Sequence, residues 1–498
     1  MIRVDAVRTE LSDWASVLSD RAKRAGFQYG HLTVRRHAGG ERMLEALLLD
    51  VESGSVEVLS APVPAGTSEF PSVTSVLPAA HWAERAVGDL WGLYAIGHQR
   101  WKSLLLHEAW PPDLFPFAIA QDGRPAARES YLMVVGGTGV HEIAVGPIHA
   151  GIIEPGHFRF SCLGEIIANL EIRLGYQHRG VEKRLTEVPW HHARHVAESA
   201  SSDTTVANAL AHSEAIEGLW DLEVPRRAAA LRTVALECER LASHLGDLGG
   251  LAGDIGFALP AATFGRLRGA ALGLCQTLSG SRLQRGFICP GGLAFGVDDK
   301  RILELKADLA GLRPIVDEAC ELLLENPGVQ ERMEGTGVLP PHLAKEFAMV
   351  GPTARASGSN YDARLHFQHA LYPGHAVEVA SEAAGDVLAR TLVRRKELEA
   401  SIRIIEQVLG DLPSGPVITA TPDRLPADKV AVSIVEAWRG SLIHWITTDA
   451  DGTIGLYAIR DPSFQNWTGL AIAARHNLVA DFPLINKSFG LSYSGDDL

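Results

Sequence analysis

The sequence predicts an α+β fold with two domains, and three observations support this. The chain has 498 residues, of which 46% are hydrophobic, which is more than one ordinary domain needs for its core. Its first part alternates strand-like runs with short helical patterns, as in a small α/β domain. After Pro225 the apolar residues recur at spacings of three and four, which indicates a large, mainly helical domain with a short β region before it.

The small N-terminal α/β domain is expected at residues 1–112. Its elements are predicted from helical spacing and from runs of β-forming residues. A turn at residues 52–54, Glu-Ser-Gly, divides the longer of the two strand regions. The expected order is helix, strand region, divided strand region and helix, at residues 7–25, 31–37, 43–63 and 79–93.

A segment rich in proline and polar residues, 113–130, is predicted to be a linker, and residues 131–498 form the second domain. This domain is expected to begin with a short β region, built from YLMVV, a Gly-Gly-Thr-Gly turn, HEIAVG and HFRFSC. Long helical patterns follow. They lie at residues 226–248, 300–325 and 376–410.

Composition excludes several classes of protein. A formal net charge of -14 makes nucleic acid an unfavourable partner. The N-terminus has no basic-then-apolar signal pattern, and no run approaches the roughly 18 apolar residues of a spanning helix, so a peripheral location is expected. No two of the five cysteines stand two residues apart. They therefore form no zinc or iron–sulfur ligand set and are expected to be buried.

Two further patterns carry little weight. The pairs Gly136-Gly137 and Gly291-Gly292 do not form a G-x-G-x-x-G turn that opens a helix after a strand, so the chain has no dinucleotide or flavin motif. In WHHARH, His191 and His195 would share one helical face. No third ligand is evident nearby, so a solvated helix end is favoured over a metal site.

Two regions carry a family resemblance. The first is HWAERAVGDLWG at residues 81–92, followed by Gly97-His98 and RWKSLLLHEAWPPD. It resembles the 30-kilodalton subunit family of NADH–quinone oxidoreductase (complex I).

The second region runs from Val145 to the C-terminus. It is similar to the 49-kilodalton complex I subunit and to the related large subunit of formate-hydrogenlyase-type (group 4) nickel–iron hydrogenases. The matching segments occur in the family's order: GPIHAG, EPGHFRF, HRGVEK, LECERLASHLGDLGG, GPTARASG followed by DAR, EAWRGSLIHW and DFPLINKSF. The fusion of both families in one chain is itself typical of the hydrogenlyase-type subunit.

The resemblance implies four cysteine ligands for a nickel–iron centre, arranged as two C-x-x-C pairs, and this sequence lacks them. Aligned on AIEGLWDLEVP, the first pair falls on Ser201 and Thr204. Aligned on DFPLINKSF, the second falls on Ser492 and Gly495. Soft thiolates hold nickel and iron, and a hydroxyl is no substitute because its pKa is far higher. We therefore expect no nickel–iron centre and no hydrogen chemistry, as in the complex I branch and in energy-converting-hydrogenase-related complexes that lack these ligands.

Other site residues follow from the resemblance. His149, in GPIHAG, matches the quinone-facing histidine of complex I, and Asp254 matches the aspartate that partners it. A histidine on a tight loop can donate a hydrogen bond or a proton to a quinone carbonyl. The alternatives are a loop histidine bonded to backbone and an aspartate at a helix C-terminus or in a turn. The quinone-binding tyrosine of complex I aligns with Asp203, which places classical quinone reduction in doubt.

Arg179 and His178, in HRGVEK, and His244, in LASHLGD, match family positions that face an iron–sulfur cluster of the neighbouring subunit. A cation or imidazole donor there favours the more electron-rich state of the cluster. We expect the face that carries Arg179 and His244 to be buried against a small iron–sulfur subunit. Because His244 stands four residues after Arg240, these two should share one helical face, and the alternative is a self-contained salt-bridge patch with Glu237 and Glu239. The alternative for Arg179 is a buried ion pair with Glu182 or Asp362. Glu182 and Lys183 are interpreted as structural partners of Arg179, and Arg355 and Arg364 as buried arginines paired with carboxylates.

Two functions remain open. In the first, the chain is an oxidoreductase subunit that passes electrons from a partner's iron–sulfur cluster to a quinone or quinone-like acceptor, coupled to ion translocation. In the second, it is a non-catalytic scaffold of a hydrogenase-related membrane complex. The chain itself is expected to bind no cofactor other than a possible quinone.

The partners that the resemblance implies are a small iron–sulfur subunit (20-kilodalton-like), a ferredoxin-like iron–sulfur subunit and antiporter-like membrane subunits. The implied place is the cytoplasmic side of the inner membrane.

Overall fold

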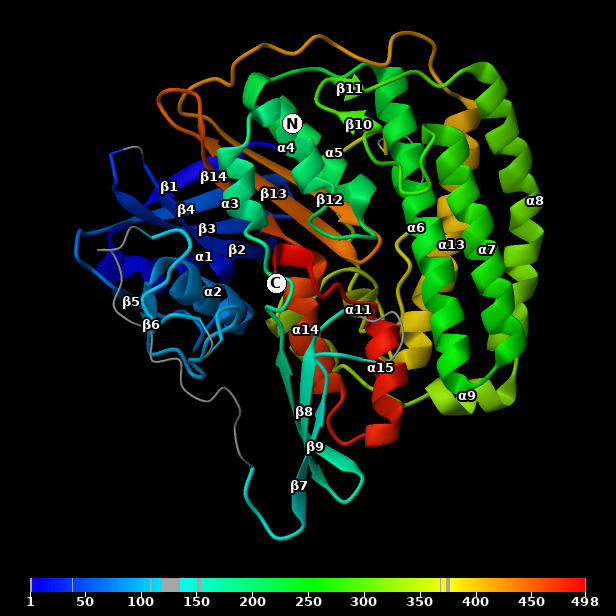
Figure 1. The fold of residues 1–498 in the computed structure, drawn as a ribbon, viewed down its shortest axis with the longest axis horizontal. Helices are drawn as coiled ribbons and strands as arrows, with labels where there is room; N and C mark the ends of the chain where they lie inside the picture. The colour runs from blue at the N-terminus through cyan, green and yellow to red at the C-terminus, as the bar shows by residue number, and fades with distance from the viewer. Residues whose placement is uncertain are drawn as a thin grey trace.

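A four-stranded sheet forms the N-terminal part of the fold, drawn in blue in Figure 1. The computed structural model describes residues 2–37, 39–107, 110–118, 135–149, 154–367, 369–372 and 377–497. The sheet order is β1-β4-β3-β2, with β1 parallel to β4 and the other pairs antiparallel. Helices α1 and α2 contact β2, and β5 and β6 form a short parallel pair. The bounds are β1 Val4–Arg8, α1 Trp14–Ala22, β2 Phe27–Arg36, β3 Arg42–Asp50, β4 Ser55–Val63, β5 Glu69–Pro71, α2 His81–Trp91 and β6 Tyr94–Ile96.

Most of the predicted N-terminal elements are present. The turn at residues 52–54 lies between β3 and β4, whose register pairs Asp50 with Ser55. The helix predicted over residues 7–25 is wrong in its first part. Val7 belongs to β1 and pairs with Leu59, because parallel pairing with β4 outweighs the local helical spacing.

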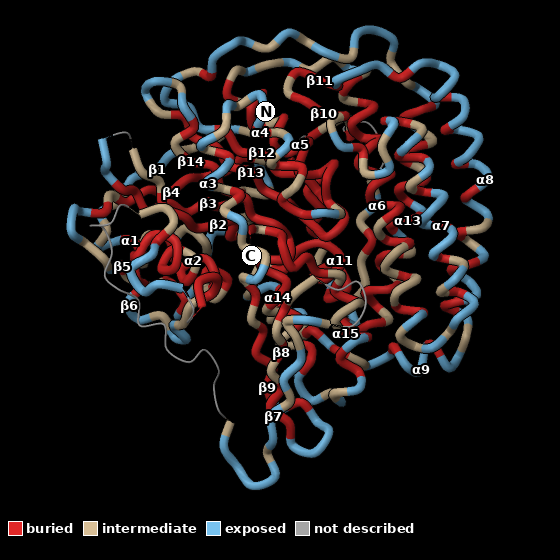
Figure 2. Tube along the Cα trace, viewed as in Figure 1, coloured by how far each residue is buried: buried red, intermediate tan, exposed pale blue. Residues whose placement is uncertain are grey.

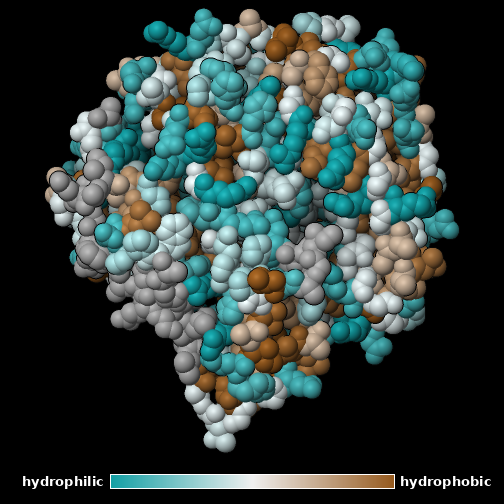
Figure 3. Space-filling model, in the orientation of Figure 1, coloured by the Kyte–Doolittle hydropathy of each residue, from teal (hydrophilic) through white to brown (hydrophobic). Residues whose placement is uncertain are grey.

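A three-stranded antiparallel meander, β7-β8-β9, projects from the lower part of the molecule in Figure 1. Its strands are β7 (Val140–Val145), β8 (His157–Leu163) and β9 (Ile166–Arg173). The predicted HEIAVG and HFRFSC strands are confirmed, β9 was not predicted, and the predicted YLMVV strand lies outside the described residues except for Val135. Figure 3 shows hydrophobic side chains gathered over β8 and β9, where Leu163 is 57% and Ile166 40% exposed.

Four long helices form a bundle on the other side of the molecule (Figure 1). They are α6 (Arg226–Ile255), α7 (Ala258–Ser279), α8 (Asp299–Leu324) and α13 (Val387–Gly410). The side chains of Asp298 and Asp386 accept backbone N–H groups at the starts of α8 and α13, so α13 begins later than residue 376. Within the described part of the chain, no helix has the length and apolar character to cross a membrane.

Shorter elements connect these parts. The helices are α3 Val181–Glu187, α4 Trp190–Ala197, α5 Thr205–Trp220, α9 Pro327–Met333, α10 Pro341–Glu346, α11 Gly351–Arg355, α12 Ala363–His366, α14 Pro462–Ala473 and α15 Phe482–Phe489. A two-residue ladder joins β10 (Ile288–Cys289) to β11 (Gly292–Leu293). The predicted α+β class, with a large, mainly helical second part, is confirmed. The five cysteines are all buried, as predicted.

A second three-stranded sheet, β12-β13-β14, lies between the bundle and the N-terminal sheet (Figure 1). Its strands are β12 (Val430–Ala437), β13 (Gly440–Thr448) and β14 (Ile454–Arg460), and α5 packs against β12 and β13. The sequence analysis missed this sheet. Because β13 is buried along its whole length, it lacks the alternation that marks a half-exposed strand.

The two sheets share a hydrophobic core. Leu47, Leu49, Val56 and Val58 from β3 and β4 pack with residues of β12, β13 and β14, among them Ile434, Ile443, Trp445 and Leu456. The opposite face of the N-terminal sheet packs against its own helices, so β3 is buried on both faces. Figure 2 shows this central region as continuously buried. The N-terminal sheet is therefore an integral layer of the molecule.

The turn between β12 and β13 depends on a close backbone approach. Gly351, at the start of α11, has φ +65°, and a Cβ there would lie 2.6 Å from Gly440 Cα and would also meet the carbonyl of Arg439. Only glycine fits this position without moving the turn. Because Gly351 has no side chain, the start of α11 can pack directly against the backbone of Arg439.

We expect Gly351→Ala to lower the free energy of unfolding by about 1–3 kcal/mol, because it combines a positive φ with a backbone clash. The matched control is Gly311→Ala, inside α8, where a Cβ would meet nothing within 4 Å. The control should stabilise the chain by up to about 1 kcal/mol. Denaturant unfolding of both variants is the measurement, and equal effects would contradict the close-approach argument.

Candidate active site

The four positions that the sequence analysis aligned with nickel–iron ligands meet in one buried cluster, here called the hydroxyl cluster. Ser201 and Thr204 lie in the turn before α5, and Ser492 and Gly495 follow α15 near the C-terminus. Ser201 Oγ lies 3.1 Å from Ser492 Oγ and 3.5 Å from Thr204 Oγ1, and the backbone N–H of Gly495 donates to Ser492 Oγ over 3.0 Å. Segments almost 300 residues apart are thus brought together as the alignment predicted.

The hydroxyl cluster does not fit a nickel–iron centre. Its donors are hydroxyl groups hydrogen-bonded to each other, and hard, protonated oxygen donors do not replace bridging thiolates. At the fourth position a side chain has no room, because a Cβ on Gly495 would lie 2.7 Å from Asp461 Oδ1. Asp461 is held there as the N-cap of α14 by the N–H of Ser463, at 2.8 Å.

An ion pair closes the cluster on one side. Arg439 donates through Nη1 and Nη2 to the two carboxylate oxygens of Asp203, at 2.7 and 2.8 Å, and through Nη1 to Thr204 Oγ1 at 3.0 Å. Its Nε donates to the carbonyl of Gly490, and its guanidinium lies over the Trp438 ring, 3.8 Å from the centroid. The arginine is therefore held in one orientation by four partners.

Asp203 lies at the mouth of the cluster. Its side chain is 43% exposed, whereas that of Arg439 is 6% exposed. Burial alone would raise the pKa of Asp203, but the Arg439 guanidinium outweighs it and holds that pKa below its ordinary value. The carboxylate is therefore ionised at neutral pH and faces outward.

A groove of about 420 Å³ opens beside this pair, between α6 and α7. Asp203 and Trp438 border it at one end, and Asp247 and Arg268 contribute further charges. Glycines of both helices form much of its remaining wall, so the backbones are accessible there. Sequence reasoning missed this groove and the role of Arg439, because Asp203 and Arg439 are separated by 236 residues and carry no local signal.

His149 and Asp254 do not bond to each other, which corrects the expected pair. His149 Nε2 lies 2.8 Å from the carbonyl of Gly156, on its own loop, and Asp254 Oδ1 accepts from Lys487 Nζ of α15 at 2.6 Å. The lysine offsets the charge of the carboxylate, while Asp254 Oδ2 is buried and has no hydrogen-bond partner among the described residues. The proposed roles of both residues in catalysis stay predictions.

Glu154, in the motif before β8, reaches the hydroxyl cluster. Glu154 Oε2 accepts the backbone N–H of Tyr493 at 3.2 Å, and its Oε1 lies 3.5 Å from Ser494 Oγ, between the two C-terminal cluster positions. Burial, reinforced by the Asp203 charge and opposed by Arg439, raises the pKa of Glu154. The sequence analysis missed Glu154, although it stands in the EPGHFRF motif.

Arg179 is exposed and bound to carbonyl oxygens beside the cluster. Its Nη1 and Nη2 donate to the carbonyls of Ser199 and Ala200 at 3.0 and 2.9 Å, and its backbone N–H donates to Asp497 Oδ1 at 3.0 Å. His178 Nδ1 lies 2.7 Å from the carbonyl of Asp497. The HRG loop is thus fixed to the C-terminus and to the residue before Ser201.

The alternative ion pairs of Arg179 are not formed. Glu182 accepts the N–H of Ile459 at 2.7 Å, and Asp362 pairs with Arg364. Lys183 donates to the carbonyl of Pro116 at 3.0 Å, so the interpretation of Glu182 and Lys183 as partners of Arg179 is wrong. The arginine is satisfied by backbone oxygens and retains its positive charge at the surface.

His244 lies inside the molecule, so it shares no exposed face with Arg179. Its ring is fully buried, and Nε2 lies 2.7 Å from Glu397 Oε2. Burial lowers the pKa of His244, although Glu397 opposes this. The expected docking face is corrected in this respect, since the helical spacing placed His244 beside Arg240 but did not reveal that both point inward. That His244 and Arg179 tune a partner's cluster stays a prediction.

Arg355 and Arg364 have the carboxylate partners predicted for them. Arg355 pairs with Glu397 at 2.5 Å and Glu436 at 2.7 Å, and Arg364 pairs with Asp362 at 2.7 Å. These groups, together with Arg240 and Glu237, are fully buried and form one charge network under the cluster. It is called the buried charge network below.

The WHHARH segment forms the N-terminal part of the short helix α4, Trp190–Ala197. His195 Nδ1 lies 3.8 Å from Glu198 Oε2, and His191 packs on His192. Across the described residues, no three His, Cys, Asp or Glu side chains gather as a metal site.

Comparison with known proteins matches both parts of the chain. The family model of the respiratory-chain NADH dehydrogenase 30 Kd subunit matches residues 5–122, and that of the 49 Kd subunit matches residues 254–432. Formate hydrogenlyase subunit 5 of Escherichia coli (strain K12) is 32% identical over 87% of this chain and 78% of its own length.

Two relatives bear complex I names. NADH-quinone oxidoreductase subunit 4 of Thermus thermophilus is 31% identical over 70% of this chain and 92% of its own length. An NADH-quinone oxidoreductase protein of Methylococcus capsulatus, whose name joins two subunits, is 26% identical over 89% of this chain and 83% of its own length. With its 30 Kd and 49 Kd parts joined in one polypeptide, the chain belongs to the family of fused subunits shared by complex I-like oxidoreductases and hydrogenases.

Proposed function

We propose that the chain is an electron-transfer subunit of a membrane-associated, complex I-like oxidoreductase, and that it does not carry out hydrogen chemistry. The observation that carries this is the hydroxyl cluster, which stands where relatives named as hydrogenases would need thiolates. Electrons come from an iron–sulfur cluster on a partner and pass to a quinone or quinone-like acceptor, coupled to ion translocation. The likeness to proteins named NADH-quinone oxidoreductase supports the class.

The acceptor is proposed to bind in the groove beside Asp203. At about 420 Å³ the groove is within the range of small-molecule sites and can hold a ring-sized headgroup. Reduction of a quinone to the quinol takes up two electrons, from the partner's cluster, and two protons. The ionised carboxylates of Asp203 and Asp247 at the groove are proposed to relay both protons from solvent, and Glu154, whose pKa is raised, is a further proton carrier near Asp203.

The HRG loop is proposed to face the partner's iron–sulfur cluster. Arg179 is exposed and donates hydrogen bonds to two backbone carbonyls. One of these carbonyls belongs to Ala200, the residue directly before Ser201. The exposed apolar side chains of β8 and β9 supply a second surface, for the membrane-bound subunits of the complex. The partners are proposed to be a 20-kilodalton-like subunit, a ferredoxin-like subunit and antiporter-like membrane subunits, on the cytoplasmic side of the membrane.

A scaffold function is the second candidate, and the Asp203–Arg439 pair favours it. A bidentate ion pair fills the position where complex I was expected to have a quinone-binding tyrosine, and a closed pair stabilises a site without needing a ligand. The two functions differ in whether the assembled complex reduces a quinone at all.

The purified complex is expected to contain no stoichiometric nickel and to show no hydrogen-dependent dye reduction. The reason is the hydroxyl donor set and the lack of room at Gly495. Elemental analysis together with a hydrogen-uptake assay checks this. One nickel per complex would contradict the proposal.

Asp203→Asn should lower the kcat for a short-chain quinone by about tenfold in the assembled complex, because it removes the ionisable group proposed to relay protons while keeping the shape. The matched control is Asp308→Asn, at an exposed position of α8. A complex that reduces no quinone, with or without the substitution, would establish the scaffold function instead.

Arg179→Met should lower the reduction potential of the adjacent cluster by an amount on the order of tens of millivolts, since it removes a nearby positive charge. Lys183→Met, in the next turn, is the matched control and should leave the potential unchanged. A redox titration of each complex, together with thermal melts of the free chains, distinguishes an effect of Arg179 on the cluster from a purely structural role. An unshifted potential with a lowered melting temperature would mean that Arg179 is only structural.

A further inference from the structure

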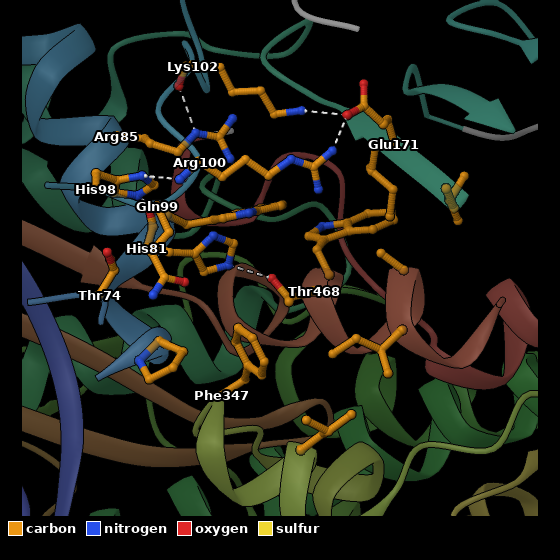
Figure 4. Close-up of a pocket in the computed structure, with 18 of the residues that line it drawn as sticks. Thr74, His81, Arg85, His98, Gln99, Arg100, Lys102, Glu171, Phe347 and Thr468 are labelled. Atoms are coloured by element: carbon orange, nitrogen blue, oxygen red, sulfur yellow. Dashed lines mark hydrogen bonds and ion pairs between the residues drawn. The ribbon is translucent and has the colours of Figure 1, made fainter. Parts of the chain in front are cut away.

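A second cavity, of about 360 Å³, lies where the N-terminal part meets the rest of the chain. Helix α2 and residues 98–102 line it on one side, and β9, α14 and the end of α10 line it on the other. It shares no lining residue with the groove beside Asp203. The cavity is shown in Figure 4.

Positive charge predominates on one wall. Figure 4 shows Arg100 and Lys102 reaching toward Glu171, and both pair with it, Lys102 Nζ at 3.1 Å from Glu171 Oε1. Arg85 lies behind them and donates to the carbonyl of Lys102 over 2.7 Å. One carboxylate is therefore shared by two cations within the cavity wall.

A further arginine lies at the rim. Arg475, just after α14, is exposed and donates to the Asn169 side-chain oxygen at 3.2 Å. Among the described lining residues, four carry a lysine or arginine charge and one, Glu171, carries a carboxylate. The histidines do not add to this sum, because burial and the neighbouring Arg85 lower the pKa of His81 well below its ordinary value.

Much of the remaining lining is apolar. Trp82 of α2, Phe347 and Ile472 contribute apolar side chains to it. His81 is held in this lining, since its Nε2 lies 2.9 Å from Thr468 Oγ1 and its ring meets Phe347 edge-on. A cavity lined by both cationic and aromatic side chains suits a molecule that carries both an anionic group and an apolar body.

We propose that this cavity binds a small organic anion, one carboxylate or phosphate group carried on a single apolar body. The anion lies against Arg100, Lys102 and Arg475, and the apolar body lies against Trp82, Phe347 and Ile472. Because its walls come from both parts of the chain, the bound molecule bridges them. This site is separate from the proposed electron-transfer function and does not depend on it.

Calorimetric titration of the full chain tests the proposal with octanoate, octyl phosphate and octanol. Both anions are expected to bind with one-to-one stoichiometry and at least tenfold more tightly than octanol, which lacks the charge. Arg475→Gln should weaken octanoate about tenfold, while Arg301→Gln on α8, the matched control, should leave it unchanged. Ala471→Phe, which places a ring in the cavity, should abolish binding.

Several results would overturn the assignment: no binding of either anion, equal binding of octanol, or unchanged affinity in both cavity variants. Preference for short-chain phosphatidylglycerol over both octyl anions would assign the cavity to a two-chain lipid instead and would also overturn it. Thermal melts of each variant establish that it is folded. If Ala471→Phe does not fold, Arg475→Gln at the exposed rim decides.

Discussion

The buried charge network is the constraint on which the arrangement of the site depends. Arg355 links Glu397 of α13 to Glu436 of β12, while Arg240 of α6 donates to the carbonyls of Glu436 and Ala437. The helical bundle and the C-terminal sheet are thereby joined at one point, three residues before Arg439. Each ion is costly to bury alone, and removal of one partner leaves an uncompensated charge, so the network tolerates no partial loss. It fixes the end of β12 and, through it, the turn that presents Arg439 to Asp203.

The hydroxyl cluster holds its segments together through hydrogen bonds and an ion pair, at the positions aligned with metal ligands. In a thiolate site the metal holds the ligand-bearing segments together. Here these segments are held by hydrogen bonds between Ser201, Ser492 and Thr204 and by the ion pair of Arg439. The side-chain volume that a fourth cysteine would occupy is taken by Asp461, which caps α14. The fold around the cluster is therefore held together by its own side chains. The proposed proton transfer uses groups at the edge of the cluster, such as Asp203 and Glu154.

The sequence predicted elements and alignment well and side-chain pairing poorly. Three of the four long helices and the β3–β4 hairpin follow from periodicity, whereas α7 lies outside the predicted helical ranges. The alignment on motif order picked out four positions that lie together in the structure. The sheet β12-β13-β14 was missed because its central strand is buried throughout and carries no alternation. The Asp254–Lys487 and Asp203–Arg439 pairs join residues more than 230 positions apart, and only the folded chain reveals which charge meets which. Helical spacing placed His244 correctly on a face with Arg240, yet spacing alone does not tell an inward face from an outward one.

The shared core of the two sheets also bears on how the chain is made. Residues of β3 and β4 are synthesised early, but the strands that cover their second face, residues 430–460, are among the last. At translation rates of about 5–20 residues per second, the apolar face of the N-terminal sheet waits on the order of tens of seconds for its cover. During that interval the nascent chain exposes an apolar surface that is prone to aggregation, formed by Leu47, Leu49, Val56 and Val58. Synthesis of this fused polypeptide thus places a demand on chaperones that ends only when its C-terminal sheet leaves the ribosome.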